Sequence, residues 1–291
     1  MSKRHPIVVV TGSSGAGTTT VKRTFDNIFR REGYRAAVIE GDAFHRYDRK
    51  EMKAEMRRVE ENGGFLSHFG PQANLWAELG KQFDAYASTG HFKTRYYLHN
   101  DEEAAPYQQE AGTFTPWRDH IEDSDLLFYE GLHGCIQDGE INLHQFADLK
   151  IGVVPIINLE WIQKIHRDTK DRGYSMEAVQ DVILRRMHDY VHYVCTQFAH
   201  TDINFQRVAV VDTSNPFIAR DIPSAGESLV VIRFKNPRGI DFPYLLSMID
   251  QSFMSRANTI VVPGQKMDLA MQLILTPLIV RLMEIKRAQY S

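Results

Sequence analysis

The sequence predicts an α/β protein with a mixed, mostly parallel β-sheet, helices on both faces, and insertions. Three observations support this fold. Short β-branched apolar runs recur along the 291 residues, stretches of helical periodicity separate them, and a glycine-rich turn joins the first run to the first helix. Strands that alternate with helices indicate a parallel sheet, because parallel neighbours need a crossover connection. We expect a single domain over residues 1–291.

The first strand is expected at Ile7–Val10, and the helix after the glycine-rich turn is expected to end at Gly33. Later strands are expected at Ala36–Ile39, Leu126–Tyr129, Ile151–Ile156, Val208–Val211, Leu229–Phe234 and Thr259–Val262. Helical spacing of apolar residues predicts long helices over Leu159–Lys170, Met176–Phe198 and Met267–Arg287. Residues 62–117 interrupt the alternation with a polar stretch rich in aromatic residues, glycine and histidine, which we interpret as an insertion near the functional site.

The glycine-rich turn, Gly12–Thr19, differs by one residue from the phosphate-binding P-loop pattern G-x-x-x-x-G-K-[ST]. Both glycines and the final hydroxyl residue are present, but Thr18 occupies the lysine position. Backbone amides of such a loop and the N-terminus of the following helix bind phosphate. We therefore predict that the nucleotide is bound by the residues of this turn, namely Gly12, Ser13, Ser14, Gly15, Ala16, Gly17, Thr18, Thr19 and Thr20. The hydroxyl of Thr19 is also expected to bind Mg²⁺.

Two other interpretations of this turn stay open at this point. An ordinary glycine-rich connection between a strand and a helix would have a similar composition. A dinucleotide-binding loop, G-x-G-x-x-G, would begin at Gly15 and use Glu40 as its ribose-binding acid, but Thr20 replaces the third glycine. Functional groups at the neighbouring strand ends are needed to distinguish these alternatives.

Acidic residues follow two further predicted strands. Asp42 comes after Ala36–Ile39, and Glu130 comes directly after Leu126–Tyr129. Ligands of such sheets bind beyond the carboxyl ends of the strands. Phosphoryl transfer needs a carboxylate to accept the proton of the nucleophile and a carboxylate to hold Mg²⁺. We assign the first role to Asp42 and the second to Glu130; a helix N-cap and a solvated turn are the non-functional alternatives.

Cationic residues follow Asp42 on a stretch that we expect to be helical. His45 and Arg49 are four residues apart, so on one helix they would share a face. That face would begin beside Asp42 and bind an anionic substrate such as a sugar phosphate. The alternative is a solvated face, because the expected helix is charged all round.

A second cationic cluster spans residues 164–172, between two of the long predicted helices. A charged helical hairpin is typical of a kinase lid, whose closure keeps water from competing for the phosphoryl group. Lys164 and Arg167 are candidates for the charge that is missing at Thr18, and an arginine here would stabilise the transferring phosphoryl group. A solvated turn between two helices is the alternative.

Composition excludes several classes of protein. A net charge of −3 argues against general nucleic-acid binding, and we find no apolar run long enough to cross a bilayer. The first residues lack the features of a signal peptide. The two cysteines, Cys135 and Cys195, are too few for a disulfide scaffold or a zinc site. We expect a reduced, cytoplasmic protein without nucleic-acid or membrane partners.

Together these motifs resemble the bacterial class of the phosphoribulokinase family, in the uridine kinase-like branch of P-loop kinases. The likeness runs nearly end to end, and threonine in the lysine position is a mark of this class. It rests on the glycine-rich loop and on five further segments, namely Glu-Gly-Asp-Ala-Phe-His-Arg at 40–46, Phe-Tyr-Glu-Gly-Leu-His-Gly at 128–134, Asn-Leu-Glu-Trp-Ile-Gln-Lys-Ile-His-Arg-Asp at 158–168, Asp-Thr-Ser-Asn-Pro-Phe at 212–217 and Asn-Pro-Arg-Gly-Ile-Asp-Phe-Pro at 236–243.

The resemblance implies a P-loop kinase fold and transfer of the γ-phosphate of ATP to ribulose 5-phosphate, which gives ribulose 1,5-bisphosphate in the Calvin cycle. It implies that Asp42 is the catalytic base and Glu130 the second acid, and that His45 and Arg49 contact the sugar phosphate. It also implies functional positions in the lid at Lys164, Arg167, Asp168 and Arg172. Among these, Asp168 would share the catalytic or metal-binding work and Arg172 would bind substrate.

The resemblance further implies a homo-octamer that NADH activates allosterically and AMP inhibits. Plant relatives carry a cysteine inside the loop and are inactivated through a disulfide, whereas this chain has Ala16 there. We therefore predict no thiol switch.

Other functions are distinguished by particular groups. A uridine or pantothenate kinase would share the loop, the strand-end acid and the lid, but a neutral nucleoside needs no cations such as His45 and Arg49. A non-catalytic nucleotide sensor would need no base, and Asp42 argues against it. A dinucleotide-dependent oxidoreductase ranks third, because Thr20 breaks its loop pattern.

Overall fold

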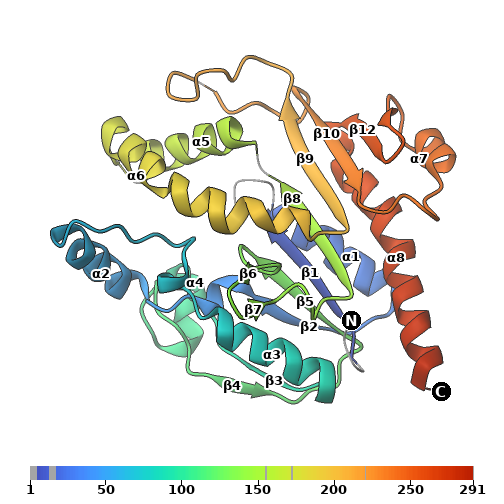
Figure 1. The fold of residues 1–291 in the computed structure, drawn as a ribbon, viewed down its shortest axis with the longest axis horizontal. Helices are drawn as coiled ribbons and strands as arrows, with labels where there is room; N and C mark the ends of the chain where they lie inside the picture. The colour runs from blue at the N-terminus through green and yellow to red at the C-terminus, as the bar shows by residue number, and fades with distance from the viewer. Residues whose placement is uncertain (1–4, 13–17, 155, 172, 220, 291) are drawn as a thin grey trace.

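The computed structural model describes residues 5–12, 18–154, 156–171, 173–219 and 221–290. Its centre is an eight-stranded sheet in the order β11-β12-β10-β9-β8-β1-β5-β2 (Figure 1). The strands of this sheet are β1 Ile7–Gly12, β2 Ala36–Glu40, β5 Leu126–Gly131, β8 Leu149–Val154, β9 Ile203–Ala209, β10 Ser228–Phe234, β11 Phe253–Arg256 and β12 Thr259–Pro263. Two small hairpin sheets pair β3 Phe92–Thr94 with β4 Arg118–His120, and β6 Gln137–Asp138 with β7 Ile141–Asn142.

Strands β2, β5, β1, β8 and β9 are parallel to one another, whereas β10, β11 and β12 add an antiparallel edge. The prediction of a mixed, mostly parallel sheet is confirmed. The register places Val10 of β1 and Glu40 of β2 on either side of Glu130 of β5. The carboxyl ends of three neighbouring strands therefore meet at one edge, as a ligand site in such a sheet requires.

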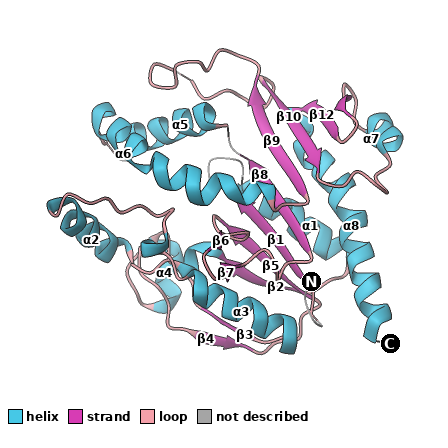
Figure 2. Cartoon of the chain, viewed as in Figure 1, coloured by secondary structure: helices cyan, strands magenta, loops and turns pink. Residues whose placement is uncertain are grey.

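Helices cover both faces of the sheet (Figure 2). The α-helices are α1 Thr18–Glu32, α2 Arg49–Glu61, α3 Trp76–Thr89, α4 Asp101–Ala104, α5 Ile157–His166, α6 Met176–Asp189, α7 Phe242–Met248 and α8 Met267–Tyr290. Short 3-10 turns are η2 Gly41–Phe44, η3 Pro71–Ala73, η4 Ala105–Tyr107, η7 Cys195–Ala199 and η8 Gly264–Lys266; π-helical turns are η5 Arg167–Asp171 and η6 Tyr190–Val194. In the described part of the chain, no helix is both long and apolar enough to cross a membrane.

The hydrophobic core has one half on each face of the sheet. On one face Val8 and Val10 of β1 pack with α1 and α8, and on the other Ile7 and Val9 pack with α3. A strand buried on both faces loses the alternation of apolar and polar residues, which is why β1 is a continuous apolar run.

The strand expected at Val208–Val211 is wrong by several residues. The actual strand, β9, alternates buried Ile203 and Phe205 with half-buried polar residues, so its sequence lacks a continuous apolar run. Val210 and Val211 follow the strand and are exposed. The antiparallel edge strand β11 was not predicted, because its four residues are mostly exposed.

Residues 62–117 have two parts with different roles. The first contains α3, whose buried Trp76, Phe83 and Tyr86 cover one face of the sheet. The second contains Tyr96, Tyr97 and other residues that line the cleft described below. The polar composition of the stretch as a whole conceals the buried helix. Treatment of 62–117 as an insertion, and of 1–291 as one domain, stays a prediction.

Candidate active site

A cleft of about 1430 Å³ opens at the carboxyl ends of β1, β2 and β5. Its walls come from α2 and residues 96–107 on one side and from α5, η5 and α6 on the other (Figure 1). The cleft brings together most of the predicted site residues that the structure describes, namely Gly12, Asp42, His45, Arg49, Glu130, Lys164, Arg167 and Asp168. Separate segments of the chain thus contribute acids and cations to one site.

Part of the predicted site lies outside this description. Ser13, Ser14, Gly15, Ala16 and Gly17 of the loop, and Arg172 of the lid, lie outside the described residues. The backbone of Thr18, Thr19 and Thr20 forms the first turn of α1, and their side chains are likewise outside the description. Roles for these residues stay predictions.

A contact between two glycines sets the spacing of the acids. A Cβ atom at Gly41 would lie 2.9 Å from Cα of Gly131 and 2.6 Å from the hydroxyl of Tyr129. A Cβ atom at Gly131 would lie 2.7 Å from Cα of Gly41. No side chain fits at either position, so the turns after β2 and β5 touch through their main chains. Asp42 and Glu130 stand directly beside this contact.

Asp42 lies in the 3-10 turn η2 and faces two histidines. His45 Nε2 is 3.2 Å from Asp42 Oδ1, and His99 Nε2 is 3.7 Å from Asp42 Oδ2. Burial raises the pKa of Asp42, but the hydrogen bond and charge of His45, with the charge of His99, outweigh it and hold this pKa below its ordinary value. Asp42 is therefore ionised at neutral pH and able to accept a hydrogen bond from a substrate hydroxyl.

The predicted shared helix face of His45 and Arg49 is wrong. The chain leaves η2 in an extended conformation at His45, and α2 begins only at Arg49. Asp48 caps α2 by accepting bonds from the backbone N–H groups of Lys50 and Glu51, while the Glu51 carboxylate accepts from Asp48 N–H. This capping box, Asp-x-x-Glu, was the sequence signal for the later start. Both cations line the cleft nevertheless.

Arg49 is fastened to the segment that faces it. Its Nη2 donates to the carbonyl of His99 at 2.8 Å, and its backbone N–H donates to the carbonyl of Gly112 at 2.9 Å. Arg95 holds the other end of the turn, where its guanidinium donates to the carbonyls of Ala43 and His45. Because Arg95 binds main-chain carbonyls at and beside His45, these bonds help to hold His45 in its position in the cleft.

Glu130 stands in a concentration of negative charge at the end of β5. Burial, with the charges of Asp42 and Glu40, raises the pKa of Glu130 to about 7, although Lys22 opposes the shift. Lys22 Nζ pairs with Glu40 at 2.7 Å. A cation would relieve the repulsion around Glu130, and a carboxylate is a ligand that Mg²⁺ prefers. Glu130 would therefore fit as one carboxylate ligand of a Mg²⁺ ion.

The predicted lid is a helical hairpin in which α5 and α6 are joined through η5 (Figure 1). Asp168 is buried and forms ion pairs with Lys164 Nζ and with Arg167 Nε, the latter at 3.3 Å. Burial lowers the pKa of Lys164, and the positive charge of Arg186 acts in the same direction. The hydrogen bond that Lys164 donates to Asp168 opposes this shift. Asp168 thus orients two cations that line the cleft.

Sequence reasoning missed several residues of the cleft. Tyr97 and His99 lie in the aromatic stretch already noted, but their spacing carried no motif. Lys22 of α1 and Arg186 of α6 also line the cleft. Each is a single charged residue on an amphipathic helix, so its sequence context looks the same as that of an ordinary surface residue. His68 sits beside His45, with ring centroids 5.4 Å apart. Only the fold brings these residues together.

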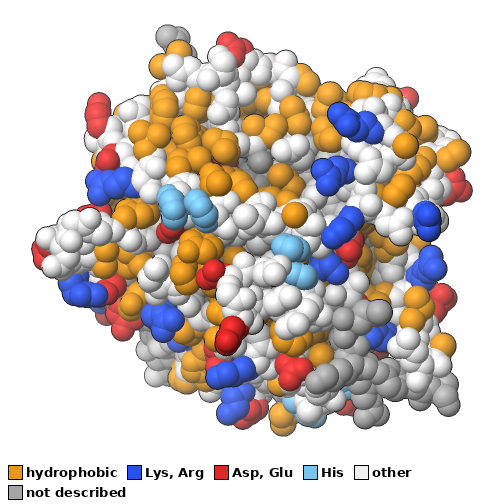
Figure 3. All heavy atoms as spheres, viewed as in Figure 1, with side chains coloured by type: hydrophobic (Ala, Val, Ile, Leu, Met, Phe, Trp, Pro, Cys, Tyr) orange, Lys and Arg blue, Asp and Glu red, His pale blue; other side chains and the backbone are white. Residues whose placement is uncertain are grey.

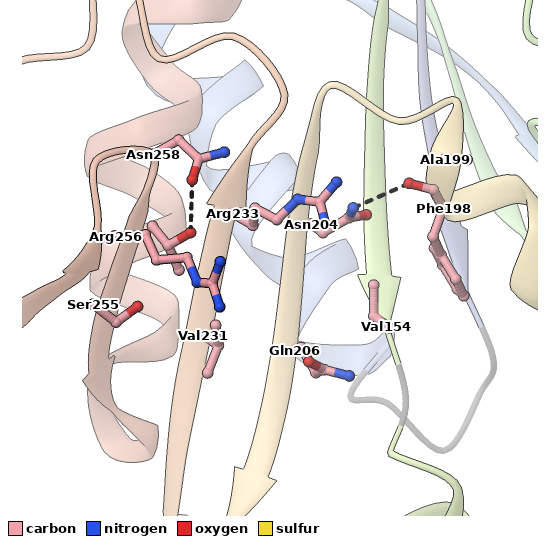
Figure 4. A pocket seen from close by; sticks show the side chains of 11 residues that line it. Val154, Phe198, Ala199, Asn204, Gln206, Val231, Arg233, Ser255, Arg256 and Asn258 are labelled. Carbon is pink, nitrogen blue, oxygen red and sulfur yellow. Dashed lines mark hydrogen bonds between the residues drawn. The ribbon is translucent and has the colours of Figure 1, made fainter.

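A second cavity, of about 770 Å³, lies on the sheet and shares no lining residue with the cleft. Figure 4 shows Asn204, Arg233 and Arg256 gathered over β9, β10 and the β11–β12 hairpin. Both arginines are exposed. The polar residues that alternate along β9 form part of this cavity.

The two cysteines differ from the thiols of redox switches. Cys135 is buried, and burial raises its pKa to about 12; burial likewise raises the pKa of Cys195. A protonated, buried thiol is a poor nucleophile. We therefore expect mild oxidation to leave activity unchanged, measured with and without later dithiol treatment. Activity that is lost on oxidation and restored by dithiol would contradict this prediction, as would the same behaviour in a Cys135→Ser variant.

The comparisons with known proteins agree with this geometry. A model of the Phosphoribulokinase / Uridine kinase family matches residues 7–214. The chain is 67% identical over 282 residues to "Phosphoribulokinase 1" of Cereibacter sphaeroides and 64% identical over 285 residues to "Phosphoribulokinase, chromosomal" of Cupriavidus necator. These alignments cover 97% and 98% of this chain and the same shares of the relatives. The structure of phosphoribulokinase from Rhodobacter spheroides superimposes with a TM-score of 0.92 at 63% identity, over 98% of this chain and all of that one.

In this mostly parallel sheet the first strand leads into a phosphate-loop sequence, and two neighbouring strands end in acids. A charged helical hairpin lies opposite them. These features together define a P-loop kinase. Within that class, the chain belongs to the phosphoribulokinase and uridine kinase family. Inside this family it is similar to the bacterial phosphoribulokinases named above.

Proposed function

We propose that the protein transfers the γ-phosphate of ATP to the 1-hydroxyl of D-ribulose 5-phosphate, giving ADP and the ribulose 1,5-bisphosphate of the Calvin cycle. The observation that carries the proposal is the position of an ionised Asp42 between cationic groups of two walls of the cleft. An acceptor that is itself phosphorylated needs such cations at a distance from its reacting hydroxyl. The high identity to relatives named phosphoribulokinase supports the same acceptor.

The residues divide the work as follows. Asp42 accepts the proton of the attacking hydroxyl as the bond to phosphorus forms. His45 and Arg49 bind the 5-phosphate of the acceptor, and Arg172 adds to this binding from the lid. Glu130 and the Thr19 hydroxyl would hold Mg²⁺, which when bound neutralises charge on the phosphates. Lys164 and Arg167, held by Asp168, supply positive charge to the transferring group when the hairpin closes.

The test is a coupled assay of ADP release with ATP and Mg²⁺ against three acceptors: ribulose 5-phosphate, uridine and pantothenate. We expect turnover with ribulose 5-phosphate alone. Turnover with uridine or pantothenate would assign the chain to a kinase for neutral acceptors. Tight ATP binding without turnover of any acceptor would identify a nucleotide sensor.

Replacement of Arg49 tests the acceptor site. Arg49→Ala is expected to raise the KM for ribulose 5-phosphate by roughly tenfold to a hundredfold, because a charge-assisted contact is worth about 1.5–3 kcal/mol. The KM for ATP should change little. The matched control is Lys50→Ala, which removes the next cation of α2, one that pairs with Glu110 at the surface and does not line the cleft. Equal KM values for ribulose 5-phosphate in both variants would mean that Arg49 is a solvated surface residue that does not bind the acceptor.

The absent loop lysine gives a second test. If backbone amides, Mg²⁺ and the lid cations neutralise the phosphates, Thr18→Lys should not improve turnover. Steady-state kinetics with ATP and ribulose 5-phosphate measure the effect. A several-fold gain in kcat would show that the loop lacks a charge that nothing else supplies.

We also propose a cytoplasmic homo-oligomer, an octamer by resemblance, that NADH activates as an allosteric effector. Hydrophobic side chains gather on the face over α5 and α6 (Figure 3). Exposed apolar residues of α6, of η6 and of the loop after β9 offer area for contact between subunits: Leu184, Val191, Val210, Val211 and Ile218. The cavity with Arg233 and Arg256 offers cationic partners for an anionic effector outside the cleft. Light scattering and assays with and without NADH test these two proposals.

A further inference from the structure

Asn74 is a buried polar residue that contacts the active site without lining it. It follows η3 and is 4% exposed. Its Nδ2 donates to the carbonyls of His68 and Gly70, at 2.8 and 2.7 Å. The opposite amide orientation would place Oδ1 against two carbonyl oxygens, so these two bonds fix Oδ1 on the other side.

That oxygen faces His45. Nδ1 of His45 lies 2.8 Å from Asn74 Oδ1, and since an amide oxygen only accepts, Nδ1 must carry a hydrogen. The other ring nitrogen, Nε2, lies 3.2 Å from the ionised Asp42. A neutral ring with hydrogen on Nδ1 would direct a lone pair at this carboxylate. Both contacts are attractive only when both nitrogens carry hydrogen.

We propose that Asn74 is a positioning residue which holds His45 as a doubly protonated imidazolium, with its Nε2–H directed into the cleft. The inference rests on the proposed function for its consequence, since that function makes His45 a ligand of the acceptor's phosphate. It adds a residue of the 62–117 stretch, outside the cleft lining, to the acceptor site.

Among the groups around His45, Asp42 favours the imidazolium most strongly and Asn74 adds to this preference, whereas the nearby cations do not favour it. Asp42 favours the imidazolium, whereas Arg95, which bonds the His45 carbonyl, opposes it. Lys164 and Arg186 face the neighbouring His68 from the lid, and His99 approaches Asp42 from the opposite wall. His68 and His133 stay neutral near pH 7, since burial lowers their pKa values to about 3. Burial also lowers the pKa of His45, and only the bonds to Asp42 and Asn74 with the Asp42 charge raise it above its ordinary value.

The consequence is a positive charge that is in place before the acceptor arrives. The imidazolium attracts the acceptor's phosphate through its charge while Nε2–H stays on Asp42, whereas the neutral ring with hydrogen on Nδ1 would carry no charge. Binding of the acceptor should therefore weaken as pH rises through the pKa of His45. Asn74 controls where on the pH scale this occurs.

The experiment compares two substitutions at position 74 that disturb the loop alike but act oppositely on His45. Both Asn74→Leu and Asn74→Asp lose the amide bonds to His68 and Gly70. Leucine also removes the acceptor for Nδ1, so the basic limb of kcat/KM for ribulose 5-phosphate should move down by about one to two pH units. Aspartate keeps an acceptor and adds negative charge, so the limb should move up.

A purely structural role for Asn74 would move both limbs the same way or neither, and either result overturns the proposal. In a His45→Asn background, the difference between the two position-74 variants should vanish; its persistence also overturns the proposal. Solid-state ¹⁵N spectra of histidine-labelled protein, with the His45 signals identified by their loss in His45→Asn, read the protonation state without an assay. A neutral His45 in the unsubstituted protein at pH 7 refutes the inference even if the kinase activity is as proposed, and an imidazolium with no activity toward ribulose 5-phosphate refutes only the function.

Discussion

Asp42→Asn is expected to lower kcat by about 10²- to 10⁴-fold, the range in which a general base contributes. An amide keeps the shape of the side chain but cannot take the proton of the attacking hydroxyl. It also leaves the His45 imidazolium without its carboxylate partner, now 3.2 Å from Asp42 Oδ1. Because Asp42 lies at the acceptor side of the cleft, the dissociation constant of ATP should stay within a few-fold of its original value.

Pre-steady-state measurement of ADP formation and equilibrium binding of ATP separate these effects. The matched control is Asp48→Asn, which alters another carboxylate of the cleft, six residues away, whose side chain accepts the bonds that cap α2. We expect that variant to keep most of its turnover. Near-normal turnover in Asp42→Asn would mean that another group, Asp168 being the first to test, accepts the proton.

Glu130→Gln is expected to lower kcat/KM by about 10²-fold or more, because a metal ligand contributes several kcal/mol to stabilisation of phosphoryl charge. The pH dependence should be equally informative. With a pKa of about 7 in the absence of metal, Glu130 is mostly protonated below that pH and must lose a proton to bind Mg²⁺. The Mg²⁺ concentration needed for half-maximal rate should therefore rise as pH falls from 8 to 6, and the variant should lose this dependence.

Stability provides a readout of Glu130 that is independent of activity. A carboxyl group whose pKa is higher in the folded than in the unfolded state destabilises the fold when it ionises, so the metal-free protein should lose stability as pH rises from about 5 toward 8. Glu130→Gln should raise Tm at pH 8 and have little effect at pH 5. Equal changes in Tm at both pH values would contradict the raised pKa.

Most of the fold could be predicted because its parallel strands are buried on both faces. Such strands are continuous apolar runs, as Ile7–Val10 and Leu126–Tyr129 show. Strand β9, which is parallel to β8 and adjoins the antiparallel edge, was harder to predict. One side of this strand carries half-buried polar residues, so its sequence alternates and its start at Ile203 was missed.

The site was predictable where function requires a residue type at a strand end. Asp42 and Glu130 could be named because glycine follows or precedes them at the ends of apolar runs, and the structure places both in one cleft. The local path from His45 to Arg49 was wrong because charge periodicity outweighed the capping signal at Asp48. Asn74 could not be found at all, since its role depends on a loop that meets His45 only in the folded chain.

The contact between Gly41 and Gly131 has a consequence for how this protein can be altered. The spacing of Asp42 and Glu130 is set where two stretches of main chain touch each other and the hydroxyl of Tyr129. Tyr129, whose hydroxyl lies against both glycines, must be kept, and we expect core residues that do not touch this contact to tolerate exchange. Redesign for a different phosphorylated acceptor can be confined to the wall formed by α2 and residues 96–107, provided that both glycines are left in place.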